Sequence, residues 1–123
     1  MAFEDHLPLR VVRRSKDSIT LECPLGPDLM NGQGVVHGGV IASIADEAVW
    51  HAMLHHFGEK RETTTTELKV NYLRPIAGPK VIARTCLLRA GRTLCVGRVD
   101  LLDASRRLCA VAIVSYILLG KRR

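Results

Sequence analysis

The segment spanning residues 31–46 contains the groups best suited to chemistry on a carbonyl. Asn31 and the triplet His37-Gly38-Gly39 come directly before a run of apolar residues at helical spacing. Glycines at the start of a helix let a ligand approach backbone N–H groups that have no acceptor within the helix. Those donors, with the helix dipole behind them, suit an oxygen on which negative charge develops. The alternative is that Gly38 and Gly39 only ease a tight turn.

Asp46 is the acid in this segment that is hardest to explain by structure alone. Aspartate is a poor residue for a helix interior, because its side chain competes for backbone hydrogen bonds. The helical period places Asp46 on one face with Ala42, Val49 and Met53, which are apolar. A carboxylate on such a face needs a partner or a catalytic purpose, such as general-base catalysis. The alternative is that Asp46 faces water beside Glu47.

The elements that must position these groups predict an α+β fold. Residues 39–57 carry apolar side chains at helical spacing, and Gly58 is a helix stop. Residues 26–39 hold five glycines and read as an irregular loop. Strands are predicted from alternation and turn residues at 9–14, 18–25, 63–73, 80–89, 93–102 and 108–119. We expect one domain over residues 1–123, with an antiparallel sheet curled around a single long helix.

Composition narrows the classes of partner. The net charge of +6 favours anionic ligands, and a phosphorylated small molecule such as coenzyme A suits it. One Trp, two Tyr and two Phe leave little for base stacking, so nucleic-acid binding is not expected. No apolar stretch is long enough for a membrane helix, and no secretory signal is seen. The four cysteines form no Cys-x-x-Cys pair, which favours reduced thiols and a cytoplasmic location.

The segment from Asn31 through His37-Gly38-Gly39 to Asp46, followed by residues 65–75, resembles the hotdog-fold thioesterases of the phenylacetic-acid-degradation type. These belong to the 4-hydroxybenzoyl-CoA thioesterase superfamily. Both spacings within the segment fit that family, and Asn71-Tyr72-Leu73-Arg74-Pro75 resembles the segment that follows its helix. The likeness in element order extends over nearly the whole chain. It implies hydrolysis of an acyl- or aryl-CoA without a cofactor, since coenzyme A is part of the substrate.

The resemblance also implies residue roles. Gly38 offers its backbone N–H to the thioester carbonyl, assisted by the Asn31 side chain. Asp46 acts as general base on water or as the nucleophile. Thr65 orients the acid or the water, and a slip of one residue would move that role to Thr64 or Thr66. His37 braces the loop.

Further residues are expected around the substrate. His37 and Gly39 belong to the same turn as the catalytic Gly38 and are assigned to substrate binding. Trp50, one turn beyond Asp46, can form a wall of an acyl pocket or belong to the core. The turn from Arg89 to Arg92, or the basic end at residues 121–123, can hold the phosphates of coenzyme A.

Helix geometry adds a constraint that is independent of the resemblance. Eight residues separate Gly38 from Asp46, a distance of about 12 Å along a helix axis. A thioester carbon must lie within about 3–3.5 Å of the attacking atom and close to the oxyanion donors. One helix therefore cannot supply both residues to one carbonyl. We predict a homodimer with shared sites, as in the family it resembles, and a dimer of dimers as the larger assembly.

Two alternative functions are kept in view, and two further possibilities are set aside. A hotdog enoyl-CoA hydratase would place a histidine with an acid, but the one histidine near the site lies in the His-Gly-Gly turn. A non-catalytic acyl-CoA-binding module would need Gly38 but not Asp46. Glu47, His51 and His55 share a helical stripe that can bind a metal, yet no third strong ligand is evident, so no metal is predicted. A Gly-x-Ser-x-Gly elbow is absent, which disfavours a serine hydrolase.

Overall fold

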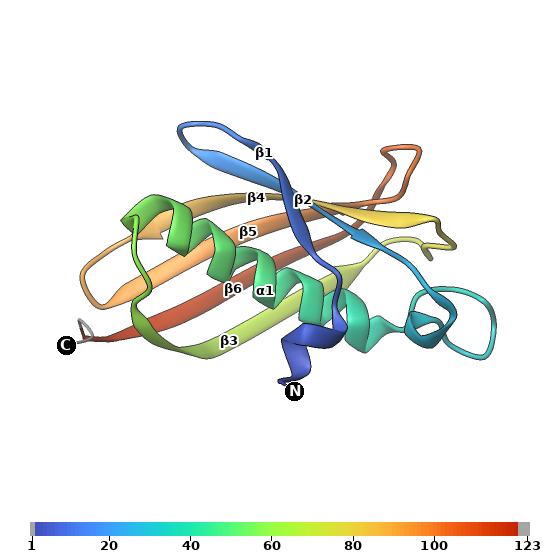
Figure 1. The fold of residues 1–123 in the computed structure, drawn as a ribbon, viewed down its shortest axis with the longest axis horizontal. Coiled ribbons are helices and arrows are strands. Elements are labelled where there is room, and N and C mark those ends of the chain that lie inside the picture. The colour runs from blue at the N-terminus through green and yellow to red at the C-terminus, as the bar shows by residue number, and fades with distance from the viewer. Residues whose placement is uncertain (1, 121–123) are drawn as a thin grey trace.

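A six-stranded antiparallel sheet curves around one long helix in the computed structural model, which describes residues 2–120 (Figure 1). The helices are a 3-10 helix at Phe3–His6, a 3-10 helix at Pro27–Leu29 and α1 at Gly38–Phe57. The strands are β1 Arg10–Arg14, β2 Ser18–Pro24, β3 Glu62–Tyr72, β4 Lys80–Ala90, β5 Leu94–Leu102 and β6 Leu108–Gly120. Their order across the sheet is β1-β2-β4-β5-β6-β3. The predicted α+β hotdog fold is confirmed.

Helix α1 begins and ends where its capping residues require. The Nδ1 atom of His37 accepts a hydrogen bond from the Gly39 N–H at 2.9 Å, which satisfies one of the donors left free at a helix start. Gly58 adopts the left-handed conformation, with φ of 74°, and its N–H donates to the Leu54 carbonyl. A side chain at Gly58 would be strained, so glycine ends the helix here.

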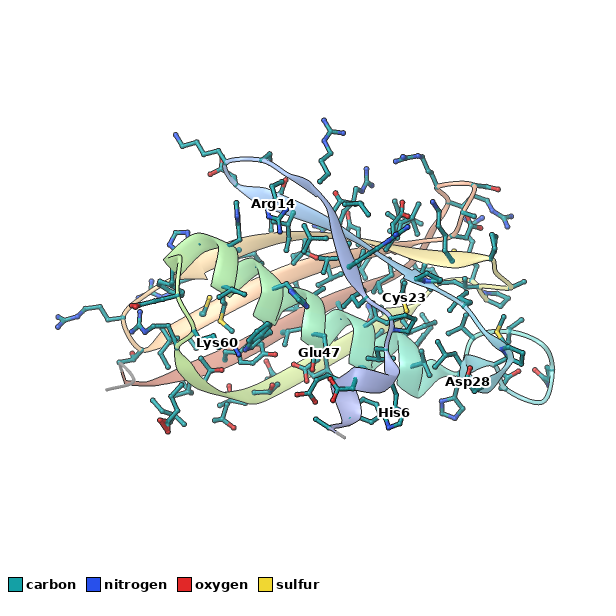
Figure 2. All side chains as sticks on the ribbon, in the orientation of Figure 1. His6, Arg14, Cys23, Asp28, Glu47 and Lys60 are labelled. Carbon is teal, nitrogen blue, oxygen red and sulfur yellow. The ribbon has the colours of Figure 1, made fainter. Side chains whose placement is uncertain are left out.

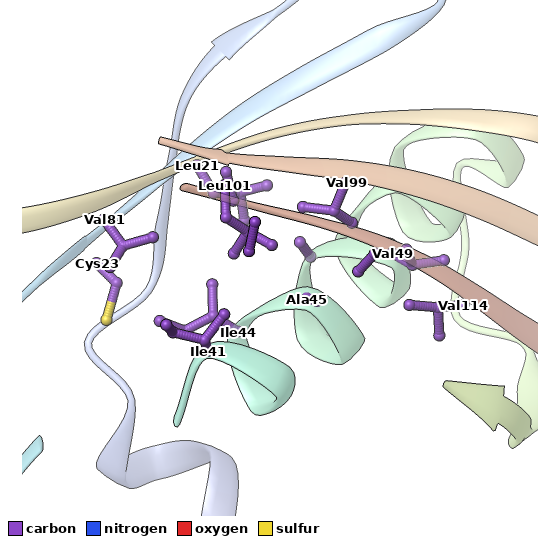
Figure 3. Packing of buried hydrophobic residues seen from close by; sticks show 14 of the residues in the cluster. Leu21, Cys23, Ile41, Ile44, Ala45, Val49, Val81, Val99, Leu101 and Val114 are labelled. Atoms are coloured by element: carbon purple, nitrogen blue, oxygen red, sulfur yellow. The ribbon is translucent and has the colours of Figure 1, made fainter. Parts of the chain in front are cut away.

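The core lies between α1 and the concave face of the sheet. Ile44, Ala45 and Val49 of the helix pack against strand residues such as Val99 and Val114 (Figure 3). Helix and sheet approach closely at Gly97 of β5, where an added Cβ would lie 2.7 Å from Val49 Cγ2. Glycine at this position therefore allows α1 to pack close to the sheet and determines the distance between helix and sheet.

The boundaries agree with the predicted elements to within about one residue, except in the loop before the helix. Residues 26–39 were expected to be irregular throughout, but Pro27–Leu29 forms a 3-10 turn and Met30 pairs with Val36 in an isolated β-bridge. The proline at the first position of the turn explains the 3-10 conformation, since its fixed φ suits a helix start. This loop is thus more ordered than its glycine content indicated.

Strand β3 occupies one edge of the sheet. It pairs with β6, the last strand of the chain, although β4 and β5 lie between them in sequence. Its other edge has no partner strand within residues 2–120. Within the same residues, no helix combines the length and the apolar character required to cross a membrane.

Candidate active site

Asp46 lies in the middle of α1, half-buried, with two hydroxyl groups on one carboxylate oxygen. Thr65 Oγ1 donates to Asp46 Oδ1 at 2.9 Å, and the Tyr116 hydroxyl donates to the same oxygen at 2.7 Å. The Tyr116 hydroxyl also lies 2.8 Å from the Asp46 backbone carbonyl. Asp46 Oδ2 has no hydrogen-bond partner among the described residues. The arrangement fixes the carboxylate through one oxygen and leaves the other available.

The two hydroxyls meet because their strands are in register. Thr65 of β3 and Tyr116 of β6 are directly opposite each other in the antiparallel pair, and the register shifts immediately afterwards, between Thr65 and Glu67. Opposed residues in such a pair lie about 4.5–5.5 Å apart and point to the same face of the sheet. Thr65, rather than Thr64 or Thr66, is therefore the threonine that contacts Asp46. Thr66 instead donates to the Ser115 carbonyl.

Tyr116 was missed by the sequence analysis. It is 6% exposed, and burial raises the pKa of its hydroxyl far above the usual range. The hydroxyl consequently stays protonated and remains a donor to Asp46. A signal existed in the strand itself: Ala112, Val114 and Leu118 share the buried face with Tyr116, and a buried tyrosine hydroxyl needs a partner. Sequence alone did not show that the partner was Asp46.

Gly38 is the first residue of α1 and is held by Tyr72. The Tyr72 hydroxyl donates to the Gly38 carbonyl at 2.7 Å. The Gly38 N–H has no acceptor among the described residues, whereas the Gly39 N–H is occupied by His37. Of the two glycines, only Gly38 thus presents a free backbone donor. Gly39 can contact a substrate only by van der Waals contact, because its N–H is already bonded to His37.

Asn31 shapes the loop that precedes the helix. Its Oδ1 atom accepts from the Gln33 N–H at 2.8 Å and from the Val35 N–H at 3.3 Å. These two bonds close the turn and orient the side chain, and they leave the Nδ2 group as the donor available to a ligand. We call the Asn31 Nδ2 group and the Gly38 N–H together the donor set.

The predicted residues fall into two groups rather than one. Gly38 begins α1, Asn31 lies in the loop before it, and Asp46 lies about two turns further along the helix. Tyr72 ties the first group to one end of β3, and Thr65 ties the second group to the middle of the same strand. We refer to these two groups as the two half-sites.

Trp50 is half-buried and forms part of a cavity of about 540 Å³ beside Asp46. The cavity is lined by residues of α1, β6 and the N-terminal segment: Glu4, Asp5, Leu7, Leu9, Glu47, Trp50, His51 and Tyr116. The Nζ atom of Lys60 lies over the Trp50 ring, 5.9 Å from its centroid. Trp50 thus packs against the core and also forms part of the cavity wall.

Arg89 and Arg92 lie far from both half-sites, at the β4–β5 turn beside the end of α1. They line an open hollow of about 950 Å³ together with Phe57 and Arg61. The structure does not bring these arginines near Asp46 or Gly38 of the same chain. The basic end at residues 121–123 lies outside the described residues.

The helical stripe considered for a metal is used in other ways. Burial, and secondarily Arg14, lowers the pKa of His51, and the Nε2 atom of His55 lies 3.0 Å from the Ser15 carbonyl. Within residues 2–120, no three His, Cys, Asp or Glu side chains are grouped so that they could hold a metal ion.

Comparison with known proteins shows the family and the fold of the chain. The model of the Thioesterase superfamily matches residues 33–110. A medium/long-chain acyl-CoA thioesterase of Escherichia coli, YigI, is 30% identical over 132 residues, which cover 95% of this chain and 85% of the relative. A thioesterase structure from Haemophilus influenzae has a TM-score of 0.87 and 26% identity, covering 95% of this chain and 82% of that one. The Escherichia coli PaaI structure shares the fold, with a TM-score of 0.83 at 18% identity over 96% and 84% of the two chains.

Proposed function

Because this chain belongs to the thioesterase superfamily, we propose that it hydrolyses the thioester of an acyl-CoA to a free acid and coenzyme A. The observation that carries the proposal is the Asp46 carboxylate, held through Oδ1 by Thr65 and Tyr116 with Oδ2 left free. A mid-helix carboxylate fixed in this way is positioned to act on a water or on a thioester carbon. The name of the Escherichia coli relative supports the same reaction.

The chemistry follows from the free groups. Asp46 Oδ2 takes a proton from a water whose oxygen bonds to the thioester carbon, or it attacks that carbon itself. Negative charge then develops on the former carbonyl oxygen, where the Gly38 N–H and the Asn31 amide can donate to it. The C–S bond breaks as the carbonyl re-forms, and the sulfur of coenzyme A leaves as a thiolate that takes up the proton held by Asp46 or one from solvent. If Asp46 attacks the carbon directly, the acyl group is left as an anhydride on Asp46, and water then hydrolyses it to the free acid and the carboxylate. None of these steps calls for a cofactor.

We propose that each complete site uses two chains. One copy supplies Gly38 and Asn31, and the other supplies Asp46, because the two half-sites of one chain are too far apart along α1 to share a carbonyl. The free edge of β3 supports a dimer: the strand is 11 residues long and no residue in it is fully buried. Such an edge is a template for pairing with another strand.

Both half-sites contact β3, so their positions along this strand predict a register for the pairing of two β3 strands. In a two-fold antiparallel pair, Tyr72 of one chain lies opposite Thr65 of the copy when the axis passes at Lys69, because the bulge between Thr65 and Glu67 takes up one residue. Tyr72 contacts Gly38, and Thr65 contacts Asp46. This register therefore brings the donor set of one chain toward the acid of the other. A dimer of two such dimers and a cytoplasmic location stay predictions.

A thiol-release assay tests the proposed function. Purified protein is incubated with short, medium, long-chain and aromatic CoA esters, including phenylacetyl-CoA and an enoyl-CoA. We expect release of free thiol from at least one class of ester. In Asp46→Asn the rate of thiol release should fall by a factor of at least about a hundred, because the base is removed. Hydration of the enoyl-CoA without thiol would instead indicate the hydratase, and tight binding without turnover would indicate an acyl-CoA-binding module.

A further inference from the structure

The cavity beside Asp46 has the size and position of a pocket for the acyl group. Its volume of about 540 Å³ lies within the range of about 300–1,000 Å³ that is usual for small-molecule sites. Tyr116, which lines the cavity, contacts the Asp46 carboxylate, and Glu47, which also lines it, is the next residue along the helix. An acyl chain whose thioester carbon lies at Asp46 can extend into this space.

The walls of the cavity are of two kinds. Leu7, Leu9, Trp50 and the ring of Tyr116 provide apolar surface suited to a hydrocarbon stem. The 3-10 helix at Phe3–His6 lies across the front of α1, and Glu47 lies on the side of α1 that faces it (Figures 1 and 2). The polar part of the lining is therefore where the N-terminal segment meets the helix.

That polar part is acidic. Glu4, Asp5 and Glu47 are its three carboxylates, and none of them has an ion-pair partner within residues 2–120. The one basic side chain of the lining is His51, where burial lowers the pKa and so favours the neutral ring. Burial also raises the pKa of Glu47, with further contributions from the charges of Glu4 and Asp46. The carboxylates thus repel one another, and no cation among the described lining residues pairs with them.

Resting on the proposed function, we infer that the enzyme prefers acyl groups with an apolar stem that ends in an ammonium or hydroxyl group, and disfavours acyl groups that end in a carboxylate. A cationic or hydrogen-bond-donating end would pair with Glu47 and its acidic neighbours, and Trp50 adds an aromatic surface that attracts cations. A second carboxylate would add to the existing repulsion in a partly dry space. Glu47 is the specificity-determining residue, because it lies closest in the chain to the reacting centre.

Four CoA esters with the same stem test this inference: hexanoyl-CoA, ω-hydroxyhexanoyl-CoA, ω-aminohexanoyl-CoA and adipoyl-CoA. Hydrolysis is followed by thiol release near pH 8, and kcat/KM is compared with hexanoyl-CoA as the internal reference. We expect the hydroxy and amino esters to exceed hexanoyl-CoA and adipoyl-CoA to fall on the order of tenfold below it, since like charges repel across the cavity.

Variants locate the effect. Glu47→Gln should reduce the ratio of amino to adipoyl kcat/KM by about tenfold, because it removes the buried charge and keeps the shape. Asp17→Asn makes the same charge change on the exposed β1–β2 turn, outside the cavity, and should leave that ratio unchanged. A Glu4→Gln and Asp5→Asn double variant should produce a smaller reduction, since both side chains are exposed.

The outcomes separate this inference from the function on which it rests. Hexanoyl-CoA hydrolysis with adipoyl-CoA turned over equally well would overturn the inferred preference while leaving the thioesterase intact. An amino-to-adipoyl ratio that Glu47→Gln does not move would overturn the role of Glu47. No thiol from any of the four esters, or from the broader panel, would contradict the proposed function and the inferred substrate class together.

Discussion

At the scale of residues, the pairing of Asp46 with Thr65 and Tyr116 is the feature that sequence described only in part. Asp46 stood out because an acid is out of place on an apolar helix face, and Thr65 was one of four consecutive threonines. Tyr116 is 70 residues from Asp46 in the chain. That contact depends on the register of β3 with β6, which no local pattern in the sequence specifies.

Removal of the tyrosine hydroxyl tests its role as a positioning residue. Tyr116→Phe should lower kcat by about tenfold with little change in KM, because a hydrogen bond to a charged group contributes about 1.5–3 kcal/mol. Thr65→Val should act in the same direction, and the double variant should lose less than the product of the two effects, since both hydroxyls hold one oxygen. A KM effect alone would indicate substrate binding instead. Equal melting temperatures serve as the control for folding.

At the scale of elements, helix and strand boundaries were accessible because the punctuating residues are local. Gly58 stops α1, and turn residues separate the strands. The position of β3 at the sheet edge was not accessible, since it follows from pairing between strands far apart in sequence. The depth of α1 on the sheet was also hidden, because it depends on Gly97 lying beneath Val49.

Substitution of that glycine measures how closely helix and sheet are packed. Gly97→Ala places a methyl group 2.7 Å from Val49 Cγ2, so the free energy of unfolding should fall by about 1–3 kcal/mol, as in other overpacked cores. Adding Val49→Ala should recover part of the loss by making room. Chemical denaturation of the two single variants and the double variant checks this. Additive losses would show that the two residues do not compete for the same space.

The β5–β6 turn offers a pH-dependent test of a different element. Asp103 Oδ1 accepts from the Ser105 and Arg107 N–H groups, and its Oδ2 accepts from the Arg107 guanidinium at 2.8 Å. The backbone hydrogen bond from Arg107 is the largest of the effects that lower the pKa of Asp103. Because the pKa of Asp103 is lower in the folded state than in the unfolded state, its carboxylate stabilises the fold at pH values above the ordinary pKa of aspartate. This stabilisation is lost as the pH falls and the folded carboxylate takes up a proton.

Asp103→Asn should therefore melt at a lower temperature than the parent protein at neutral pH. The difference should shrink as the pH falls below about 4, where the parent also loses its carboxylate. Melting curves followed by circular dichroism at several pH values measure the difference. A deficit that stays constant down to acidic pH would show that the charge of Asp103 does not stabilise the turn.

At the scale of the whole molecule, the sequence predicted a shared site from helix geometry alone, and the edge of β3 is where we propose that the second copy binds. Both half-sites lie along β3, whose outer edge is unpaired within the described residues. The charge of +6 over the chain suits a phosphorylated substrate. The shape of the acyl pocket was not predictable, because it is formed where the N-terminal segment crosses α1.

The proposed register predicts a crosslink between two copies. Lys69 of one chain lies opposite Lys69 of the other, with directly opposed residues about 4.5–5.5 Å apart. A Lys69→Cys variant should therefore form a covalent dimer under mild oxidation. The parent protein, whose native cysteines are buried or half-buried, is the control. Monomer alone on a non-reducing gel would contradict this register.

Complementation between two inactive chains tests directly whether the active site is shared between two copies. Asn31→Ala removes one half-site and Asp46→Ala removes the other, so each variant alone should show little thiol release. When the two are mixed and allowed to exchange subunits, a heterodimer should contain one site with both parent residues and regain activity. We predict recovery of up to half the activity of a parent dimer per heterodimer. No recovery, with heterodimers demonstrated by mass spectrometry, would contradict a site shared between two chains.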